Sequence, residues 1–151
     1  MRLLSKSLGG RLLRACAALA LPAALALSFS PSGYAGTRCD VSVGGKATVA
    51  GFLRFEVLNP TLAAGCFACI PIKKCQSPRR TKNQLVTALT PCDGCVIAST
   101  GFKSFVVACP GSGMTLRACA VASCPGAPCL ANQALPQIIG GQTLSNTCIP
   151  F

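Results

Sequence analysis

The sequence contains no histidine and no tryptophan, and only three of its 151 residues are acidic. Histidine is the most common general base and a frequent zinc ligand, so its absence excludes the usual Ser-His-Asp and Cys-His catalytic arrangements. Glycoside hydrolysis and binding of hard cations both need several carboxylates, which Asp40, Glu56 and Asp93 supply poorly. The composition therefore predicts a protein that is not an enzyme.

Basic and apolar residues dominate what the chain does contain. Fourteen Lys and Arg residues oppose the three acidic residues, and hydrophobic residues make up 51% of the chain against 11% for charged residues. Disordered chains combine high charge with few apolar residues, which is the opposite balance. The length fits a single folded domain.

The first 35 residues have the order of parts that is typical of a secretory signal peptide. Residues 1–14 are basic and contain no acidic residue, and residues 15–29 are uncharged and almost entirely apolar. Gly33 and Ala35 then place two small residues two positions apart, as signal peptidase requires. The apolar run is shorter than the roughly 20 residues that span a bilayer. We therefore expect residues 1–35 to be removed and the mature protein to be secreted.

Cleavage after Ala35 removes 35 of the 151 residues and leaves a mature chain of 116, with eleven of the twelve cysteines. In a short secreted chain, this cysteine density predicts a disulfide scaffold. Eleven cysteines can form five disulfides and leave one thiol, which is either free or links two copies of the chain. We therefore expect residues 36–151 to form one cysteine-rich domain, although the spacing does not determine which cysteines pair.

Short segments separated by turn residues predict a small β-rich domain with many loops and little helix. Residues 52–58 place three apolar side chains on one face and Arg54 and Glu56 on the other, which is the pattern of a half-buried strand. Residues 84–90 and 102–108 are short and rich in β-branched or aromatic residues, which favours strands.

A hairpin is expected around Asp93-Gly94, a dipeptide typical of tight β-turns. It pairs residues 84–91 with residues 96–100. Residues 117–123 are rich in alanine, which favours helix, but the prolines that follow limit this helix to about two turns.

Residues 137–144 contain a Gly-Gly pair and predict either one more strand or a tight turn. The hydrophobic core is expected to include four phenylalanines: Phe52, Phe55, Phe102 and Phe105.

Two C-x-x-C pairs carry the sharpest chemical signal in the chain. Cys66 and Cys69 are followed by Cys92 and Cys95, at a spacing slightly longer than that of zinc ribbons. Four thiolates on two turns can hold zinc tetrahedrally. The export signal and the seven other cysteines favour disulfides instead. We expect disulfides and no cofactor, with Cys92 and Cys95 each bonded to a distant cysteine. A zinc site formed by the four cysteines is the alternative.

A C-x-x-C pair can also be the redox centre of a thiol-disulfide oxidoreductase. Such a centre usually lies at a helix N-terminus or beside cations that stabilise the thiolate. Neither pair precedes a predicted helix, although Lys73 and Lys74 follow Cys66 and Cys69 closely. Thiol exchange is therefore a second alternative.

Residues 73–82 contain five cations and no acidic residue. Cys75 and Pro78 interrupt this run, which predicts a tethered surface loop. Concentrated positive charge attracts anionic polymers and membrane surfaces. Nucleic acid is disfavoured by the export signal and by the lack of aromatic residues that could stack on bases. The candidate binding residues are Lys73, Lys74, Arg79, Arg80 and Lys82.

The sequence as a whole predicts a small, secreted, cationic protein that acts through its surface. We expect it to bind an anionic extracellular surface or partner, or to have a structural role. The odd cysteine makes a disulfide-linked dimer a further expectation.

Overall fold

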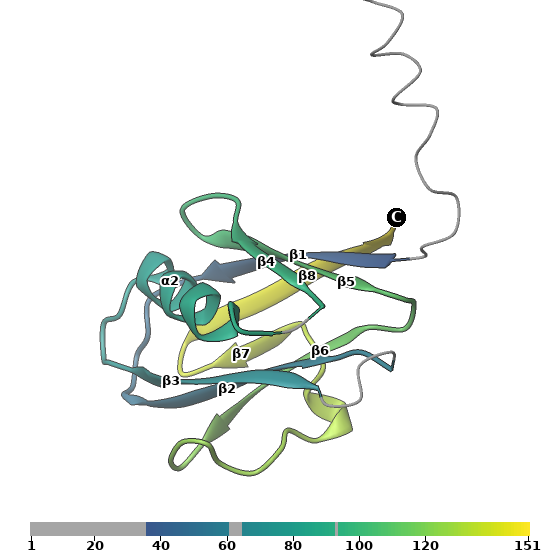
Figure 1. Cartoon of the computed structure of the whole chain (residues 1–151). Helices are drawn as coiled ribbons and strands as arrows, with labels where there is room; N and C mark the ends of the chain where they lie inside the picture. The colour runs from purple at the N-terminus through teal and green to yellow at the C-terminus, as the bar shows by residue number, and fades with distance from the viewer. Residues whose placement is uncertain (1–35, 61–64, 93) are drawn as a thin grey trace, which may run out of the picture. The chain divides into compact units, whose positions relative to one another are not determined.

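A computed structural model describes residues 36–60, 65–92 and 94–151, which form two antiparallel sheets and one α-helix (Figure 1). The larger sheet has the strand order β4 (Val96–Ser99), β5 (Ser104–Pro110), β1 (Gly36–Gly44), β8 (Gln142–Pro150) and β7 (Gln137–Ile139). The smaller sheet has the order β3 (Cys66–Ile72), β2 (Gly51–Leu58) and β6 (Thr115–Val121). The helix is α2 (Pro78–Leu89), and a 3-10 turn, η1, spans Ala131–Gln133.

The expected fold class is confirmed: the domain is β-rich, contains little helix and is cross-linked by disulfides. The expected signal peptide, residues 1–35, lies outside the described residues. No helix in the described part of the chain is long and apolar enough to cross a membrane.

Apolar side chains from the facing sides of the two sheets form the core. The rings of Phe55 on β2 and Phe105 on β5 meet at its centre, with 5.8 Å between ring centroids and a tilt of 60°, and both residues are fully buried. Tilted aromatic pairs at this distance are favourable. The core prediction is wrong for Phe102, which lies in the β4–β5 loop and is 72% exposed. Phe52 is only half-buried because it lies on the outer face of β2.

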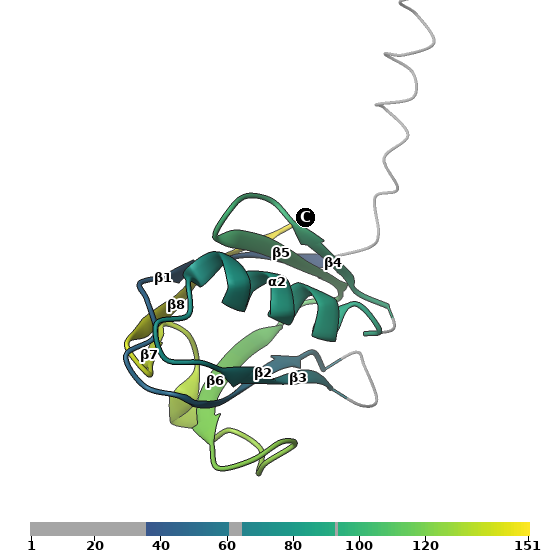
Figure 2. The same ribbon diagram turned by 90° about the vertical axis from the view of Figure 1, so that its left-hand side faces the viewer.

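Helix α2 closes one side of the sandwich, between β3 and β4 (Figure 2). Its fully buried residues Thr81, Leu85 and Leu89 recur every fourth position, so they share one face of the helix. Ser77 caps the helix, since its hydroxyl accepts a hydrogen bond from the amide of Arg80 at 3.3 Å.

The strand expected over residues 84–90 is wrong, because residues 84–89 form the second half of α2 and Thr90 is its C-cap. The side-chain types in this segment favour a strand, but the tertiary contacts that bury one face of the helix outweigh that weak local preference. The expected hairpin with residues 96–100 is therefore also wrong. β4 pairs instead with β5, which contains most of the strand expected over residues 102–108.

The short helix expected over residues 117–123 is wrong as well. Most of this segment belongs to β6, which pairs along β2 from Thr115 to Val121. Helix propensity is a weak preference that such a continuous strand pairing overrides. Residues 137–144 contain both structures considered for them. β7 and β8 are joined by a tight turn at Gly140 and Gly141, whose φ angles of 58° and 87° favour glycine.

The loop between β6 and η1 covers the outer face of the smaller sheet and buries Arg54 and Glu56, which were expected to face solvent. Nε of Arg54 lies 2.9 Å from Oε2 of Glu56. The Arg54 guanidinium also donates to the carbonyl of Pro125 at 2.9 Å, and the amide of Cys129 donates to Glu56 at 3.1 Å. These partners compensate the cost of burying the two charges.

Five disulfides cross-link the described residues, and Cys75 is the one free cysteine among them, in agreement with the odd count. The bonded pairs are Cys39–Cys148, Cys66–Cys92, Cys69–Cys124, Cys95–Cys109 and Cys119–Cys129. Two of them, Cys69–Cys124 and Cys119–Cys129, hold the loop after β6 against the smaller sheet.

We expect the substitution Leu85→Ala to lower the free energy of unfolding by about 2–5 kcal/mol, because it leaves a cavity between α2 and the two sheets. Urea unfolding of the oxidised protein measures this change. Asn83→Ala, two positions away on the exposed side of the same helix, is the matched control and should change stability by about 0.5 kcal/mol or less. Equal effects of the two substitutions would contradict the assigned helix face.

Mass spectrometry of the unreduced, proteolysed protein should recover the five disulfide-linked peptides. Alkylation of the unfolded, unreduced protein should modify one cysteine of the domain, Cys75. Alkylation at Cys66, Cys69, Cys92 and Cys95 as well would reject this connectivity and restore the zinc alternative.

Candidate functional site: a cationic end of the sandwich

Four connecting segments meet at one end of the sandwich, on the left in Figure 1. They are the β1–β2 loop, the β3–α2 loop with the first turn of α2, the β4–β5 loop and the β7–β8 turn. We call this region the cationic end and define it as residues 45–50, 73–80, 100–103 and 140–141. Antiparallel pairing brings these segments together, because it places the last residues of β1 beside the first residues of β5 and β8.

Backbone hydrogen bonds fasten these segments to one another. The amide of Cys75 donates to the carbonyl of Ala47 at 2.7 Å, and the amide of Ala47 donates to the carbonyl of Gln76 at 3.0 Å. The amide of Thr48 donates to the carbonyl of Gly140 at 2.7 Å. The β1–β2 loop is therefore bonded to both the β3–α2 loop and the β7–β8 turn.

A chain of side-chain hydrogen bonds lies beneath these loops. Gln142 on β8 is 2% exposed, and its amide nitrogen donates to the carbonyls of Gly45 and Gln76, each at 3.1 Å. Its amide oxygen accepts from the hydroxyl of Thr81 at 2.8 Å. The side-chain amide of Gln76 donates to that hydroxyl and to the side-chain oxygen of Gln84, both at 2.9 Å. Buried polar groups of this kind are stable only with their partners in place, so the network fixes the loops above it.

Four of the five predicted binding residues lie exposed at the cationic end. Lys73 and Lys74 follow β3 directly, and Arg79 and Arg80 lie in the first turn of α2. The structure thus brings together most of the run that the sequence indicated, although half of the run is helix rather than loop.

Lys82 does not belong to this exposed surface. It is 4% exposed, and its Nζ donates to the hydroxyl of Ser99 at 2.7 Å. Its position on α2 faces β4, three residues after Arg79 and on the same side of the helix. The prediction that Lys82 lies in a tethered surface loop is therefore wrong.

Two further exposed cations, Lys46 and Lys103, lie at this end and were missed by sequence reasoning. Lys46 precedes Ala47, which is bonded to the β3–α2 loop. The carbonyl of Lys103 accepts from the amide of Val43 at 2.8 Å, which places Lys103 beside the end of β1. Each is an isolated cation in the sequence, so only the strand pairing could have linked it to residues 73–80.

The carboxylates that the structure describes are engaged elsewhere. Asp40 lies in the middle of β1 and pairs with Arg38 at 3.2 Å, and Glu56 is buried against Arg54. In the described ranges, no carboxylate forms an ion pair with any of the six exposed cations of the cationic end. Their positive charges therefore add rather than cancel.

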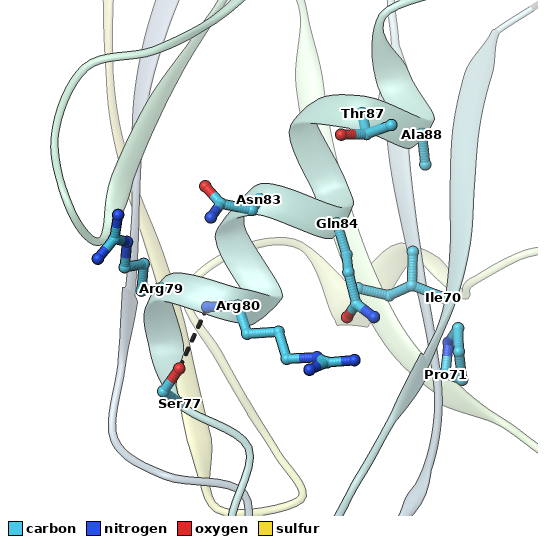
Figure 3. Close-up of a pocket in the computed structure, with 9 residues that line it drawn as sticks. All are labelled: Ile70, Pro71, Ser77, Arg79, Arg80, Asn83, Gln84, Thr87 and Ala88. Atoms are coloured by element: carbon cyan, nitrogen blue, oxygen red, sulfur yellow. Dashed lines mark hydrogen bonds between the residues drawn. The ribbon is translucent and has the colours of Figure 1, made fainter.

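Two open grooves flank the beginning of α2. One has a volume of about 610 Å³ and lies between α2 and β3, and Figure 3 shows Arg80 pointing across it toward Pro71. The other has a volume of about 290 Å³ and lies toward the β4–β5 loop. There the guanidinium carbon of Arg79 lies 4.9 Å from the ring centroid of Phe102, a distance at which cation–π attraction is expected. The two arginines thus extend to opposite sides of the helix.

The expectation of disulfides is confirmed for both C-x-x-C pairs, and Cys92 and Cys95 do not bond to each other, as expected. Their four cysteines enter three different disulfides: Cys66–Cys92, Cys69–Cys124 and Cys95–Cys109. Neither pair forms an internal bond, and the four sulfur atoms are not free to bind zinc. Over residues 36–60, 65–92 and 94–151, no group of three or more His, Cys, Asp and Glu side chains could hold a metal ion.

The free cysteine, Cys75, is exposed and lies next to Lys74 in the β3–α2 loop. A disulfide-linked dimer through this residue stays a prediction.

No protein-family model, no curated protein and no solved structure matches this chain. The functional argument therefore depends on the geometry of the cationic end.

We expect Gln142→Ala to lower the free energy of unfolding by about 1–3 kcal/mol, because it removes the amide that donates to the carbonyls of Gly45 and Gln76 and accepts from the hydroxyl of Thr81. Thermal and urea unfolding measure the change. Thr143→Ala, at the next position of β8 on its exposed face, is the matched control and should be close to neutral. A neutral Gln142→Ala substitution would show that the network does not support the loops.

Proposed function

We propose that this protein is secreted and binds an anionic extracellular surface or polymer through its cationic end, without catalysis. The observation that carries this proposal is the convergence of six exposed cations from three separate segments at that end. They are Lys46, Lys73, Lys74, Arg79, Arg80 and Lys103. The ion pairs of Asp40 and Glu56 at other positions leave this charge uncompensated in the described structure.

Secretion is supported by the cysteine chemistry. Disulfides persist in oxidising compartments and are rare in the cytosol, and the domain has five. The basic and then apolar order of residues 1–35, which ends in the small residues Gly33 and Ala35, is the second support.

Binding would proceed in two stages. The positive field of the cationic end first attracts the anionic surface over a distance of about one Debye length, roughly 8 Å at physiological ionic strength. The exposed side chains then contact phosphate, sulfate or carboxylate groups. Because hydrogen bonds hold the loops in place before contact, little backbone entropy is lost on binding.

The quadruple variant K73Q/K74Q/R79Q/R80Q should bind heparin at least about 100-fold more weakly than the wild type at physiological salt, since each cation near an anionic surface contributes about 1 kcal/mol. Binding of the wild type should also weaken steadily as salt is raised. Surface plasmon resonance on immobilised heparin, and on supported bilayers of phosphatidylserine and phosphatidylcholine, measures both effects.

Two single substitutions provide a comparison at equal net charge. Arg80→Gln removes one positive charge at the cationic end, and Arg38→Gln removes one from the middle of the larger sheet. We expect the first to weaken binding and the second to leave it nearly unchanged. Equal losses would mean that net charge rather than this surface determines binding, and no salt dependence would reject the proposal.

A further inference from the structure

Two large apolar side chains project from the same loops that carry the cations. Phe102, in the β4–β5 loop, is 72% exposed, and Val49, in the β1–β2 loop, is 57% exposed. Phe102 adjoins Lys103 in sequence, and Val49 shares its loop with Lys46. Both views of the ribbon show the β4–β5 loop rising above α2 at the upper edge of the larger sheet (Figures 1 and 2).

The surroundings of Phe102 combine an apolar and a cationic element within one contact. The guanidinium of Arg79 lies over the ring at 4.9 Å, yet most of the ring is accessible to solvent. Arg79 also lines the smaller groove with Phe102, so the charge and the ring face the same space. An aromatic ring beside a cation suits the boundary between lipid headgroups and acyl chains, where one part of the pair meets phosphate and the other meets hydrocarbon.

This arrangement distinguishes between two kinds of anionic surface that the cationic end could bind. A sulfated or carboxylated polysaccharide offers charge and hydroxyl groups, which the cations alone can bind. A bilayer offers anionic headgroups above an apolar layer, and peripheral attachment to it is strongest when electrostatic attraction and apolar burial act together. Only the second offers a hydrocarbon layer in which apolar side chains exposed on cationic loops can be buried.

We infer that the anionic surface is a phospholipid bilayer and that the Phe102 side chain enters its interfacial layer, with Val49 as a second apolar contact. The inference rests on the proposed function of the cationic end. Lys46, Lys103 and Arg79 contact the headgroups while the two apolar side chains lie below them. The domain attaches to one leaflet and does not span the bilayer.

Tryptophan fluorescence tests the insertion directly, because the chain contains no tryptophan. In the variant Phe102→Trp, we expect a blue shift and reduced quenching by acrylamide when vesicles of phosphatidylserine and phosphatidylcholine in equal parts are added. Vesicles of phosphatidylcholine alone should produce neither effect at the same lipid concentration. The matched control is Ile149→Trp, near the other end of β8 and 50% exposed, which should report no change with either vesicle.

A second variant separates the lipid inference from the general proposal. Phe102→Ala should weaken binding to the phosphatidylserine vesicles about tenfold, as expected when part of the burial of a Phe side chain is lost, and should weaken heparin binding much less. Because Phe102 lies outside the core, the substitution should also leave thermal stability unchanged.

Salt-dependent binding to heparin together with no blue shift at residue 102 would overturn the membrane inference and leave the proposed function standing. Equal loss of heparin and vesicle binding in Phe102→Ala would also overturn it, because the ring would then act in contacts common to both surfaces. If the wild type binds neither heparin nor the anionic vesicles, both proposals are overturned.

Discussion

The side-chain amide of Gln142 joins three segments on which the cationic end is built. Strand pairing alone does not bond the β1–β2 loop to the β3–α2 loop or to the beginning of α2. Gln142 bonds to a residue from each, namely Gly45, Gln76 and Thr81. Bringing like charges together costs free energy, and six exposed cations lie on or next to these segments. The buried network and the core beneath it must supply the stability that offsets this repulsion.

Much of the scaffold could be predicted from composition and order along the chain. The cysteine count predicted five disulfides and one remaining thiol, and the alternation in residues 52–58 predicted β2. Helix α2 was harder because its signals are spread out. Ser77 caps it, and Thr81, Leu85 and Leu89 define its buried face, whereas the side-chain types within residues 84–90 favour a strand. β6 depends on its pairing with β2, a partner about sixty residues earlier that no local pattern reveals.

The candidate site was predicted only in part for a related reason. The basic run identified four exposed cations, but burial of Lys82 depends on which face of α2 meets β4. Lys46 and Lys103 joined the site only through the register of β1 with its neighbours. The sequence therefore predicted the cations that lie close together along the chain. It did not predict the cations that only strand pairing brings to the same end of the domain. Arg54 and Glu56 show the same limit, since their burial depends on a loop that two distant disulfides hold in place.

The disulfide between Cys39 and Cys148 has a mechanical consequence. It joins β1 to β8 across a sequence separation of 109 residues, at positions directly opposite each other in the sheet. A pulling force applied at Gly36 and Phe151 would pass through this covalent bond, and the chain between the two cysteines would carry almost no tension. The core and the cationic end would keep their shape under loads that separate strands held only by hydrogen bonds. The covalent connection between the two terminal strands thus protects the folded domain against force applied at its ends.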